Sequence, residues 1–299
     1  MPHPTPPPIS DEDWLRYRDR APTPPEPRGP RVSRRLLLGG GAVAGLGLML
    51  PVGLRTLGDH LPGGAWDPGA GAPRERASCV DAATLPIRAR IGKARIIYEP
   101  TARAATMRID GAFAAQLDRW LADWNATSRH PGATQLWSYG AHVTKDECRS
   151  WHANGRAFDI SRLRAGDRLL VSARTDLWHT VDADQQERLR RRYWALTASL
   201  SLHFSYVLHH HFDPAHANHL HVDNAVSGNG MSRFEKRSRV QNQTVQAICQ
   251  TLWGQPGEVT GEWSDTRAQA GPVLDRLGLS DLGRQESWQA FLRASVPRG

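Results

Sequence analysis

The spacing of apolar and polar residues changes several times between residues 93 and 223, as expected for a domain that mixes strands and helices. Seven short stretches have the alternating or β-branched content of strands: ARIIYEP, AATMRID, TQLWSYGAH, RAFDIS, DRLLVSA, SYVLH and HLHVD. Pro100 separates the first two of these stretches. The pattern predicts a small antiparallel sheet.

Helical periodicity lies between and after these strands. Phe113, Leu117, Leu121 and Trp124 recur at helical spacing after Asp110, a candidate N-cap. Further helices are expected at about 184–201, from residue 244, at 265–277 and at 286–295. We therefore predict an α+β fold, a small antiparallel sheet with flanking helices, followed by a short all-α C-terminal module.

The first 78 residues have the composition of a tail, an apolar helix and a linker. Ten of the 21 prolines fall in residues 1–30, which favours a disordered tail. Residues 36–54 carry no charge and would reach about 28 Å as a helix, long enough to cross a membrane. We predict these units: 1–32 tail, 33–55 signal or anchor helix, 56–78 linker, 79–232 catalytic domain, 233–243 connector and 244–299 helical module.

The apolar segment also indicates where the protein works. Ser33, Arg34 and Arg35 stand before it as in a twin-arginine export signal, and a plain anchor with positive flanks is the alternative. Both interpretations leave the arginine-rich tail inside the cell. No convincing cleavage site follows, so we expect a single retained N-terminal membrane span and an exported domain in the cell envelope.

Charge and cysteine content add little that is specific. The formal net charge is +8, but only three of the 38 basic residues are lysines, and no dense basic run interleaved with aromatic residues occurs in the body of the chain. We therefore expect no nucleic-acid partner. Cys79, Cys148 and Cys249 allow one disulfide and one free thiol in an oxidising compartment, and the sequence does not assign the pair.

Two separated motifs predict a metal centre. His152 precedes the turn at Gly155, and Asp159 lies in the strand-like stretch RAFDIS. His219 and His221 are two residues apart on a strand, so both rings project from one face. Two histidines and a carboxylate are a typical ligand set for catalytic Zn²⁺, with one position left for water. Zinc lowers the pKa of that water to about 7, which gives a hydroxide that can attack an amide carbonyl.

Other polar residues near these motifs are weaker candidates. With thirteen histidines in the chain, a structural role for each is an alternative. His209, His210 and His211 are better explained as surface, supporting or substrate-contacting groups. For substrate contact we single out Arg149, Tyr139 and His216, with His142 as a further donor, although Arg149 also fits a surface role.

The two motifs together resemble a known family. Ser150-x-His152-x-x-Gly155-x-Ala157-x-Asp159, with His219-x-His221, is similar to the zinc peptidases of the lysostaphin, D-Ala-D-Ala metallopeptidase and hedgehog type. Within them, SWHANGRAFDIS and FDPAHANHLHVD most resemble the extensin-like C-terminal family of bacteria. The resemblance covers about residues 80–230. It implies that His152, Asp159 and His221 bind the metal.

The resemblance also implies a catalytic role for His219, as general base or in stabilising the transition state. Many D-Ala-D-Ala enzymes of this superfamily place a glutamate three residues before the last ligand, and here that position is Asn218. The chain departs from that pattern, so a mechanism assisted by histidine is expected in place of one that depends on glutamate.

The C-terminal segment resembles a peptidoglycan-binding three-helix repeat. The likeness rests on VQAICQTLWG and VTGEWSDTRAQAGPVL, and the second glycine of the usual Gly-x-Trp-Gly is Ser264 here. A helical cap packed on the catalytic domain through Trp253 and Trp263 is the alternative.

Two functions remain open at this point. The first is an exported zinc peptidase that cuts the peptide part of peptidoglycan, as a D-Ala-type carboxypeptidase or an endopeptidase. The second is a wall-binding scaffold that keeps the fold without turnover. The complete ligand set favours the first.

Overall fold

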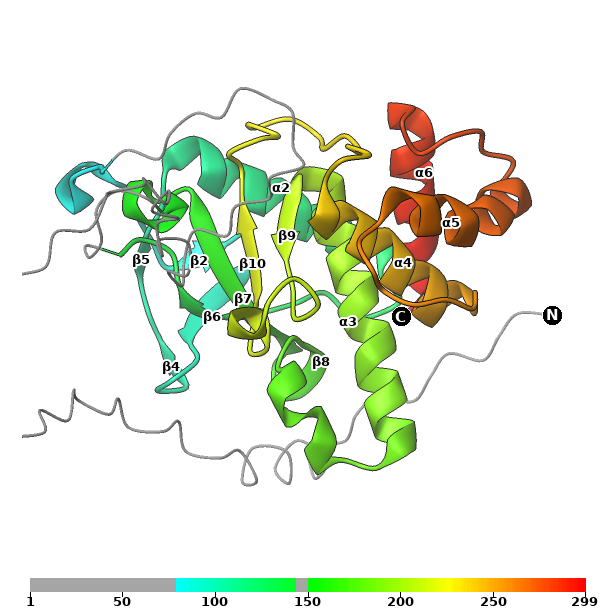
Figure 1. The fold of residues 1–299 in the computed structure, drawn as a ribbon. Helices are drawn as coiled ribbons and strands as arrows, with labels where there is room; N and C mark the ends of the chain where they lie inside the picture. Colours follow the sequence, from blue (N-terminus) through cyan, green and yellow to red (C-terminus); the bar gives the residue numbers. More distant parts are fainter. Residues whose placement is uncertain (1–78, 144–149) are drawn as a thin grey trace, which may run out of the picture.

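The protein forms a mixed α+β structure in the computed structural model, which describes residues 79–143 and 150–299 (Figure 1). The strands are β1 (Ile87–Arg88), β2 (Arg90–Ile91), β3 (Ala94–Tyr98), β4 (Arg103–Ala104), β5 (Met107–Arg108), β6 (Gln135–Gly140), β7 (Ala157–Ala165), β8 (Arg168–Ser172), β9 (Tyr206–Leu208) and β10 (Leu220–Asp223). The helices are α2 (Gly111–Thr127), α3 (Ala183–His203), α4 (Arg239–Trp253), α5 (Trp263–Leu277) and α6 (Gln285–Ser295), with short 3₁₀ turns η1 (Ala82–Thr84), η2 (Trp151–Asn154), η3 (Thr175–Thr180), η4 (Pro214–His216) and η5 (Val296–Arg298). The predicted α+β class is confirmed.

The main sheet has eight strands, with the order β2-β3-β6-β7-β10-β9, while β4 pairs with β3 and β8 pairs with β7. The long strand β7 pairs with β10 through its first half and with β8 through its second half. A separate two-stranded sheet joins β1 to β5.

One pair in the main sheet is parallel, so the prediction of a purely antiparallel sheet was wrong. β3 and β6 run in the same direction. The chain between them contains α2, because parallel neighbours need a long crossover connection. The predicted N-cap of α2 is present, since the Asp110 side chain accepts hydrogen bonds from the backbone N–H groups of Ala112 and Phe113.

The two faces of the central strands have different surroundings. Phe158 and Ile160 of β7, and Leu220 and Val222 of β10, are buried in the main hydrophobic core with the apolar residues of α2 and α3. Asp159, His221 and Asp223 occupy the alternate positions and therefore project from the opposite face. The core fixes the strands, and Asp159, His221 and Asp223 line the face away from α2 and α3.

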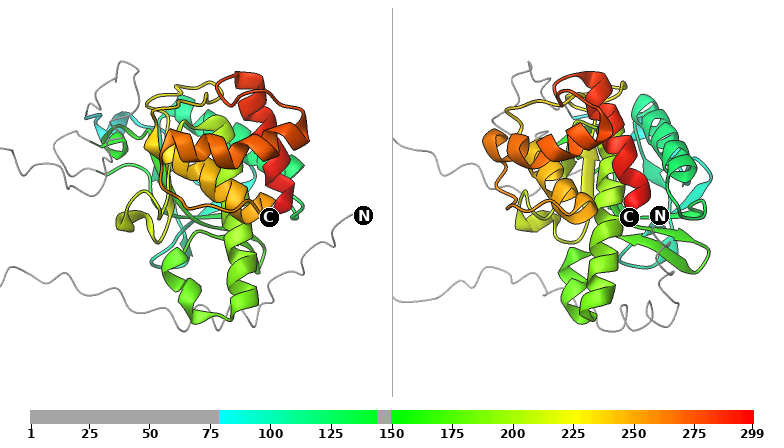
Figure 2. Two further views of the ribbon diagram at one scale, coloured as in Figure 1. Left: turned by 45° about the vertical axis from the view of Figure 1, so that its right-hand side comes forward. Right: turned by 90° about the vertical axis from the view of Figure 1, so that its right-hand side faces the viewer.

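α4 and α6 pack against α3, and α5 packs against α4 and α6 (Figure 2). The hydrophobic core is continuous from the sheet through α3 into these helices and includes Ile248, Trp253, Val273 and Trp288. α4 begins at Arg239, inside the segment predicted as a connector.

Several predictions fall outside the described residues: the tail, the membrane span and the linker in 1–78, and Cys148 and Arg149 in 144–149. Among the residues that the structure describes, no helix has the length and apolarity to span a membrane. Cys79 is disulfide-bonded, whereas Cys249 is free and buried.

Candidate metal centre

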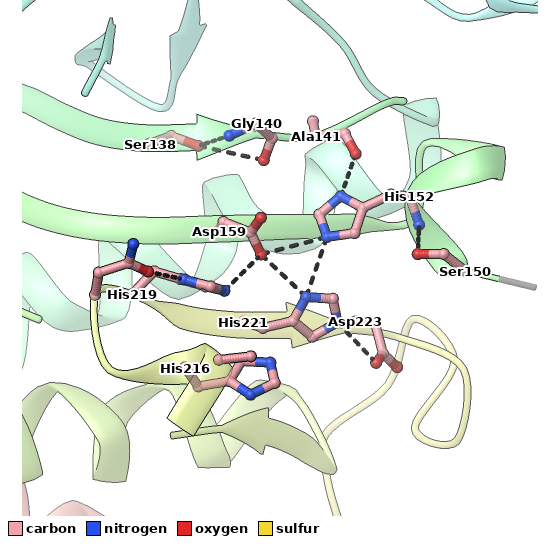
Figure 3. A network of polar contacts seen from close by, with 12 residues as sticks. Ser138, Gly140, Ala141, Ser150, His152, Asp159, His216, His219, His221 and Asp223 are labelled. Atoms are coloured by element: carbon pink, nitrogen blue, oxygen red, sulfur yellow. Dashed lines mark hydrogen bonds and ion pairs between the residues drawn. The ribbon is translucent and has the colours of Figure 1, made fainter. Parts of the chain in front are cut away.

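Three side chains converge on the sheet face away from α2 and α3 (Figure 3). His221 Nδ1 lies 3.1 Å from His152 Nε2 and 3.0 Å from Asp159 Oδ1, and His152 Nε2 lies 3.3 Å from Asp159 Oδ1. The predicted trio is thus a group that could hold a metal ion.

His152 is positioned by a tight turn. The Ser150 hydroxyl accepts a hydrogen bond from the His152 backbone N–H at the start of η2. Gly155 ends the turn at φ 70°, where a Cβ would lie 2.8 Å from Leu85 Cδ1 and 3.1 Å from the Asp110 backbone nitrogen. Only glycine fits both the left-handed backbone and this close approach.

Asp159 and His221 are held by strand pairing. They are direct partners in the antiparallel ladder between β7 and β10. Side chains of directly opposed residues lie on the same face of a sheet, at a short Cβ separation. Strand pairing therefore brings the motif near residue 159 and the motif near residue 221 into direct contact.

The second nitrogen of each ligand histidine has its own partner. His152 donates its Nδ1–H to the carbonyl of Ala141, and His221 donates its Nε2–H to Asp223 Oδ2 at 3.3 Å. A carbonyl and a carboxylate can only accept, so the remaining nitrogens, His152 Nε2 and His221 Nδ1, present lone pairs in the neutral rings.

This donor set fits a divalent metal ion. Zinc bonds of 2.0–2.1 Å at the tetrahedral angle separate neighbouring ligand atoms by about 3.3 Å, close to the distances within the trio. Three acceptor atoms held this close together repel one another unless a cation or a proton lies between them. Three ligands are one fewer than the four that zinc usually binds, so a water molecule or a substrate group would complete the set.

Without a metal, the trio is strongly coupled. Burial acts to raise the pKa of Asp159, but the charge of His152 and hydrogen bonds from His152 and His221 outweigh it and hold this pKa well below its usual value. Burial acts to lower the pKa of His221, but hydrogen bonds to Asp159 and Asp223 raise it to about 10. The site therefore attracts positive charge.

His219 lies beside the trio without belonging to it. Its Nε2 is 3.5 Å from Asp159 Oδ1, and its Nδ1–H donates to Asn218 Oδ1 at 2.6 Å. The metal-ligating group does not include it. Burial, partly opposed by the charge of Asp159, lowers the pKa of His219 to about 4, so Nε2 is an unprotonated acceptor at neutral pH.

His216 lies beside His219 and His221 at the same site. Its Nδ1 is 2.8 Å from Asp213 Oδ1, and its ring centroid lies 5.1 Å from that of His219 and 5.9 Å from that of His221. Burial lowers the pKa of His216. Its uncharged ring is part of the wall of the site.

Tyr139, of the predicted substrate contacts, lies next to His219, with the ring centroids 5.9 Å apart. Burial raises its pKa to about 12, so the phenol stays protonated and can donate a hydrogen bond. Arg149 is outside the described residues. His142 lines a different pocket, with Cys79, Val80, Asp81, Ala82, Val143 and Ala153.

The histidines at 209–211 are grouped away from the trio. Their rings pack around Trp194, and His210 also contacts Tyr193. They follow β9 and pack against α3, and His209 Nε2 lies 3.1 Å from Thr244 Oγ1 of α4.

Sequence reasoning missed the residues that orient the rings. Asp223 could have been found, because it continues the alternation of His219 and His221 on one strand face. Asp213 and Asn218 are near the histidines in sequence but have no distinguishing motif. The Ala141 carbonyl leaves no signal in the sequence at all.

Comparison with known proteins gives one match. Residues 104–233 match the family model described as extensin-like protein C-terminus. The curated proteins and the solved structures contain no match. The matched range includes His152, Asp159 and His221 and ends before α4 begins at Arg239. The part of the chain that carries the candidate metal centre is therefore similar to the extensin-like C-terminal family.

Proposed function

We propose that this protein is a zinc-dependent peptidase that cuts the peptide part of peptidoglycan, as a D-Ala-type carboxypeptidase or an endopeptidase. The observation that carries the proposal is the convergence of His152, Asp159 and His221 beside a third histidine, His219, whose Nε2 is unprotonated. The side chains of Asp159 and His219 are each 16% exposed, so this side of the trio is partly open to solvent.

The proposed chemistry divides between the metal and the chain. When bound, a divalent ion such as Zn²⁺ polarises the scissile carbonyl and lowers the pKa of the attacking water. His219 Nε2 accepts the proton of that water. It then delivers the same proton to the amine nitrogen as the carbon–nitrogen bond breaks.

Asn218 has a defined part in this mechanism. Its side-chain oxygen holds the proton of His219 on Nδ1, which leaves Nε2 facing Asp159 and the trio. The position occupied by a glutamate base in many D-Ala-D-Ala enzymes thus supports a histidine base here.

Tyr139 and His216 are proposed to contact the substrate. The neutral Tyr139 phenol can donate a hydrogen bond to the carbonyl oxygen as negative charge develops on it. Asp213 fixes the His216 ring on the other side of His219.

The proposed location is the cell envelope. The twin-arginine-like segment and the apolar run from 36 to 54 support an anchored chain with the extensin-like part outside the cytoplasm. The C-terminal helices are proposed to add affinity for peptidoglycan, a role compatible with their packing on α3.

Digestion of purified peptidoglycan tests the function. Zinc-loaded protein should release new peptide products, identified by mass spectrometry, and their masses should define the bond that is cut. The His219→Ala variant should keep its metal and release products about 10²–10⁴-fold more slowly. Binding to the polymer without any new product would contradict the peptidase and support the wall-binding scaffold.

A further inference from the structure

The two histidines of the trio face the metal position through different nitrogens. His152 presents Nε2, and His221 presents Nδ1. Which nitrogen a histidine presents is decided by the partner of its other nitrogen. For His152 that partner is the neutral carbonyl of Ala141, whereas for His221 it is the carboxylate of Asp223.

Asp223 is itself held in place. It lies two residues after His221 on β10, so both side chains project from the same face. The residue is 4% exposed, and its two oxygens are divided between two donors. Oδ1 accepts the backbone N–H of Ala225 at 3.0 Å, and Oδ2 faces His221 Nε2 at 3.3 Å.

We propose that Asp223 is a positioning residue that selects Nδ1 of His221 as the metal-binding atom and strengthens its hold on the metal. A carboxylate can only accept, so Nε2 keeps its proton and Nδ1 keeps its lone pair. The proposal rests on the metal centre of the proposed function but does not depend on the peptidase activity.

Charge gives Asp223 a second effect. Asp159 and Asp223 together carry two negative charges, which balance one divalent cation in a largely buried site. The carboxylate also makes the His221 ring a stronger donor toward the metal. The Ala141 carbonyl gives His152 orientation without charge.

The Asp223→Asn variant keeps nearly the same side-chain volume but removes the negative charge and one hydrogen-bond acceptor. The Ala225 N–H needs an acceptor, so the amide oxygen faces it and the amide NH₂ is directed at His221 Nε2. This places donor against donor, and relief requires the proton to leave Nε2 for Nδ1, the atom that should bind the metal. Partners of this kind typically change metal affinity 10–100-fold.

The test is zinc affinity of the full chain, measured by competition with a chromophoric chelator. Asp223→Asn should bind zinc about 10–100-fold more weakly than the wild type. Asp123→Asn is the matched control, because Asp123 accepts a hydrogen bond from His203 Nε2 at 2.8 Å outside the metal centre. The control should keep wild-type affinity, and circular dichroism should verify the fold of both variants.

If Asp223→Asn does not fold, a measurement on the wild-type protein still tests the proposal. Long-range ¹⁵N–¹H spectra of the zinc-loaded wild type should show His221 protonated at Nε2, and protonation at Nδ1 would overturn the proposal. Asp223→Asn affinity within twofold of the wild type would also overturn it, as would a wild type that binds no zinc. Weaker zinc binding in the variant of a protein without hydrolytic activity would uphold the proposal and refute the peptidase.

Discussion

Each histidine near the trio has one ring nitrogen occupied by a fixed acceptor. Ala141, Asp213, Asn218 and Asp223 provide these acceptors, so the opposite nitrogens have lone pairs when the rings are neutral. Identical side chains therefore take different roles according to their second partners. At the scale of residues, a metal-ligand histidine differs from a general-base histidine in the position of its ring and in which ring nitrogen faces the site.

Substitution of the two histidines on either side of Leu220 should separate these roles. His221→Ala removes an atom of the trio and should abolish tight metal binding. His219→Ala should leave metal content unchanged and lower kcat for peptide hydrolysis by about 10²–10⁴-fold, the usual contribution of a general base. Elemental analysis and product release measure the two effects. Loss of metal in His219→Ala would identify His219 as a ligand instead.

Strand alternation and a turn motif are local properties, and they predicted His152, Asp159 and the pair His219 and His221 as candidates. The family resemblance then implied that His221 is the third ligand. Asp159 and His221 are brought together by the pairing of two such strands. The acceptor for His152 could not be predicted, since it is a backbone carbonyl from a neighbouring strand end. The acceptor for His221 could have been predicted, because Asp223 has the same two-residue spacing as His219 and His221.

At the scale of elements, the short turn η2 holds His152, one of the three candidate metal ligands. Its place is fixed by Gly155, whose carbonyl also accepts a hydrogen bond from the Asp110 N–H at the start of α2. The trio thus depends on the packing of η2 against Leu85 and the N-terminus of α2.

Gly155→Ala should move η2 and weaken the metal centre. The new methyl group would meet Leu85 and the Asp110 backbone, and φ 70° is unfavourable for alanine. We expect a loss of about 1–3 kcal/mol in the free energy of unfolding. Zinc affinity should fall in parallel. Gly166→Ala is a control, because φ there is 58° but no atom lies within 4 Å of the added carbon. Equal zinc affinity in all three proteins would contradict this account of η2.

The parallel β3–β6 pair was not predictable from the sequence. Alternation of apolar residues identifies a strand but not the direction of its neighbour. Direction is decided by the connection, and α2 with its flanking segments is long enough to return the chain to the same end of the sheet. The helices, in contrast, follow from their apolar spacing and from the Asp110 cap.

At the scale of the whole molecule, the C-terminal helices and the sheet share one core. Trp288 is 1% exposed and donates its Nε1–H to Ser232 Oγ at 2.8 Å, and its ring packs against Phe234 and Phe291. These contacts join α6 to the end of the family-matched range. We expect the described residues to unfold in one cooperative transition.

Trp288→Ala tests this coupling. Loss of the buried ring should cost about 3–5 kcal/mol and lower the stability of the metal centre together with that of the helices. Trp288→Phe keeps much of the packing and should cost less. Thermal unfolding followed by tryptophan fluorescence and by metal release should give coincident transitions. A separate early transition of the helices, with metal still bound, would show that they form an independent module.

Acid should destabilise the molecule through histidines away from the metal. Burial, then the charges of His210 and His211, hold the pKa of His209 well below 6.5, and burial lowers that of His210 to about 3. Below pH 6.5, these two histidines therefore bind protons in the unfolded chain but stay unprotonated in the folded chain. Its free energy of unfolding should fall as the pH drops from about 6.5 toward 3, by up to about 1.4 kcal/mol per pH unit for each histidine.

The variant His209→Gln isolates this effect. Its unfolding free energy should depend less steeply on pH between 6.5 and 4 than that of the wild type, as measured by urea denaturation. The same slope in both proteins would show that His209 is not kept neutral by the fold.

The account depends most on the metal centre, so metal content is its most direct test. Full-length protein and its His152→Ala variant should be supplied with zinc, freed of excess ion and analysed for bound elements. We predict about one zinc ion per chain in the wild type and none in the variant, which lacks one of the three ligands. Absence of bound metal in both proteins, or equal content in both, would contradict the assignment of His152, Asp159 and His221.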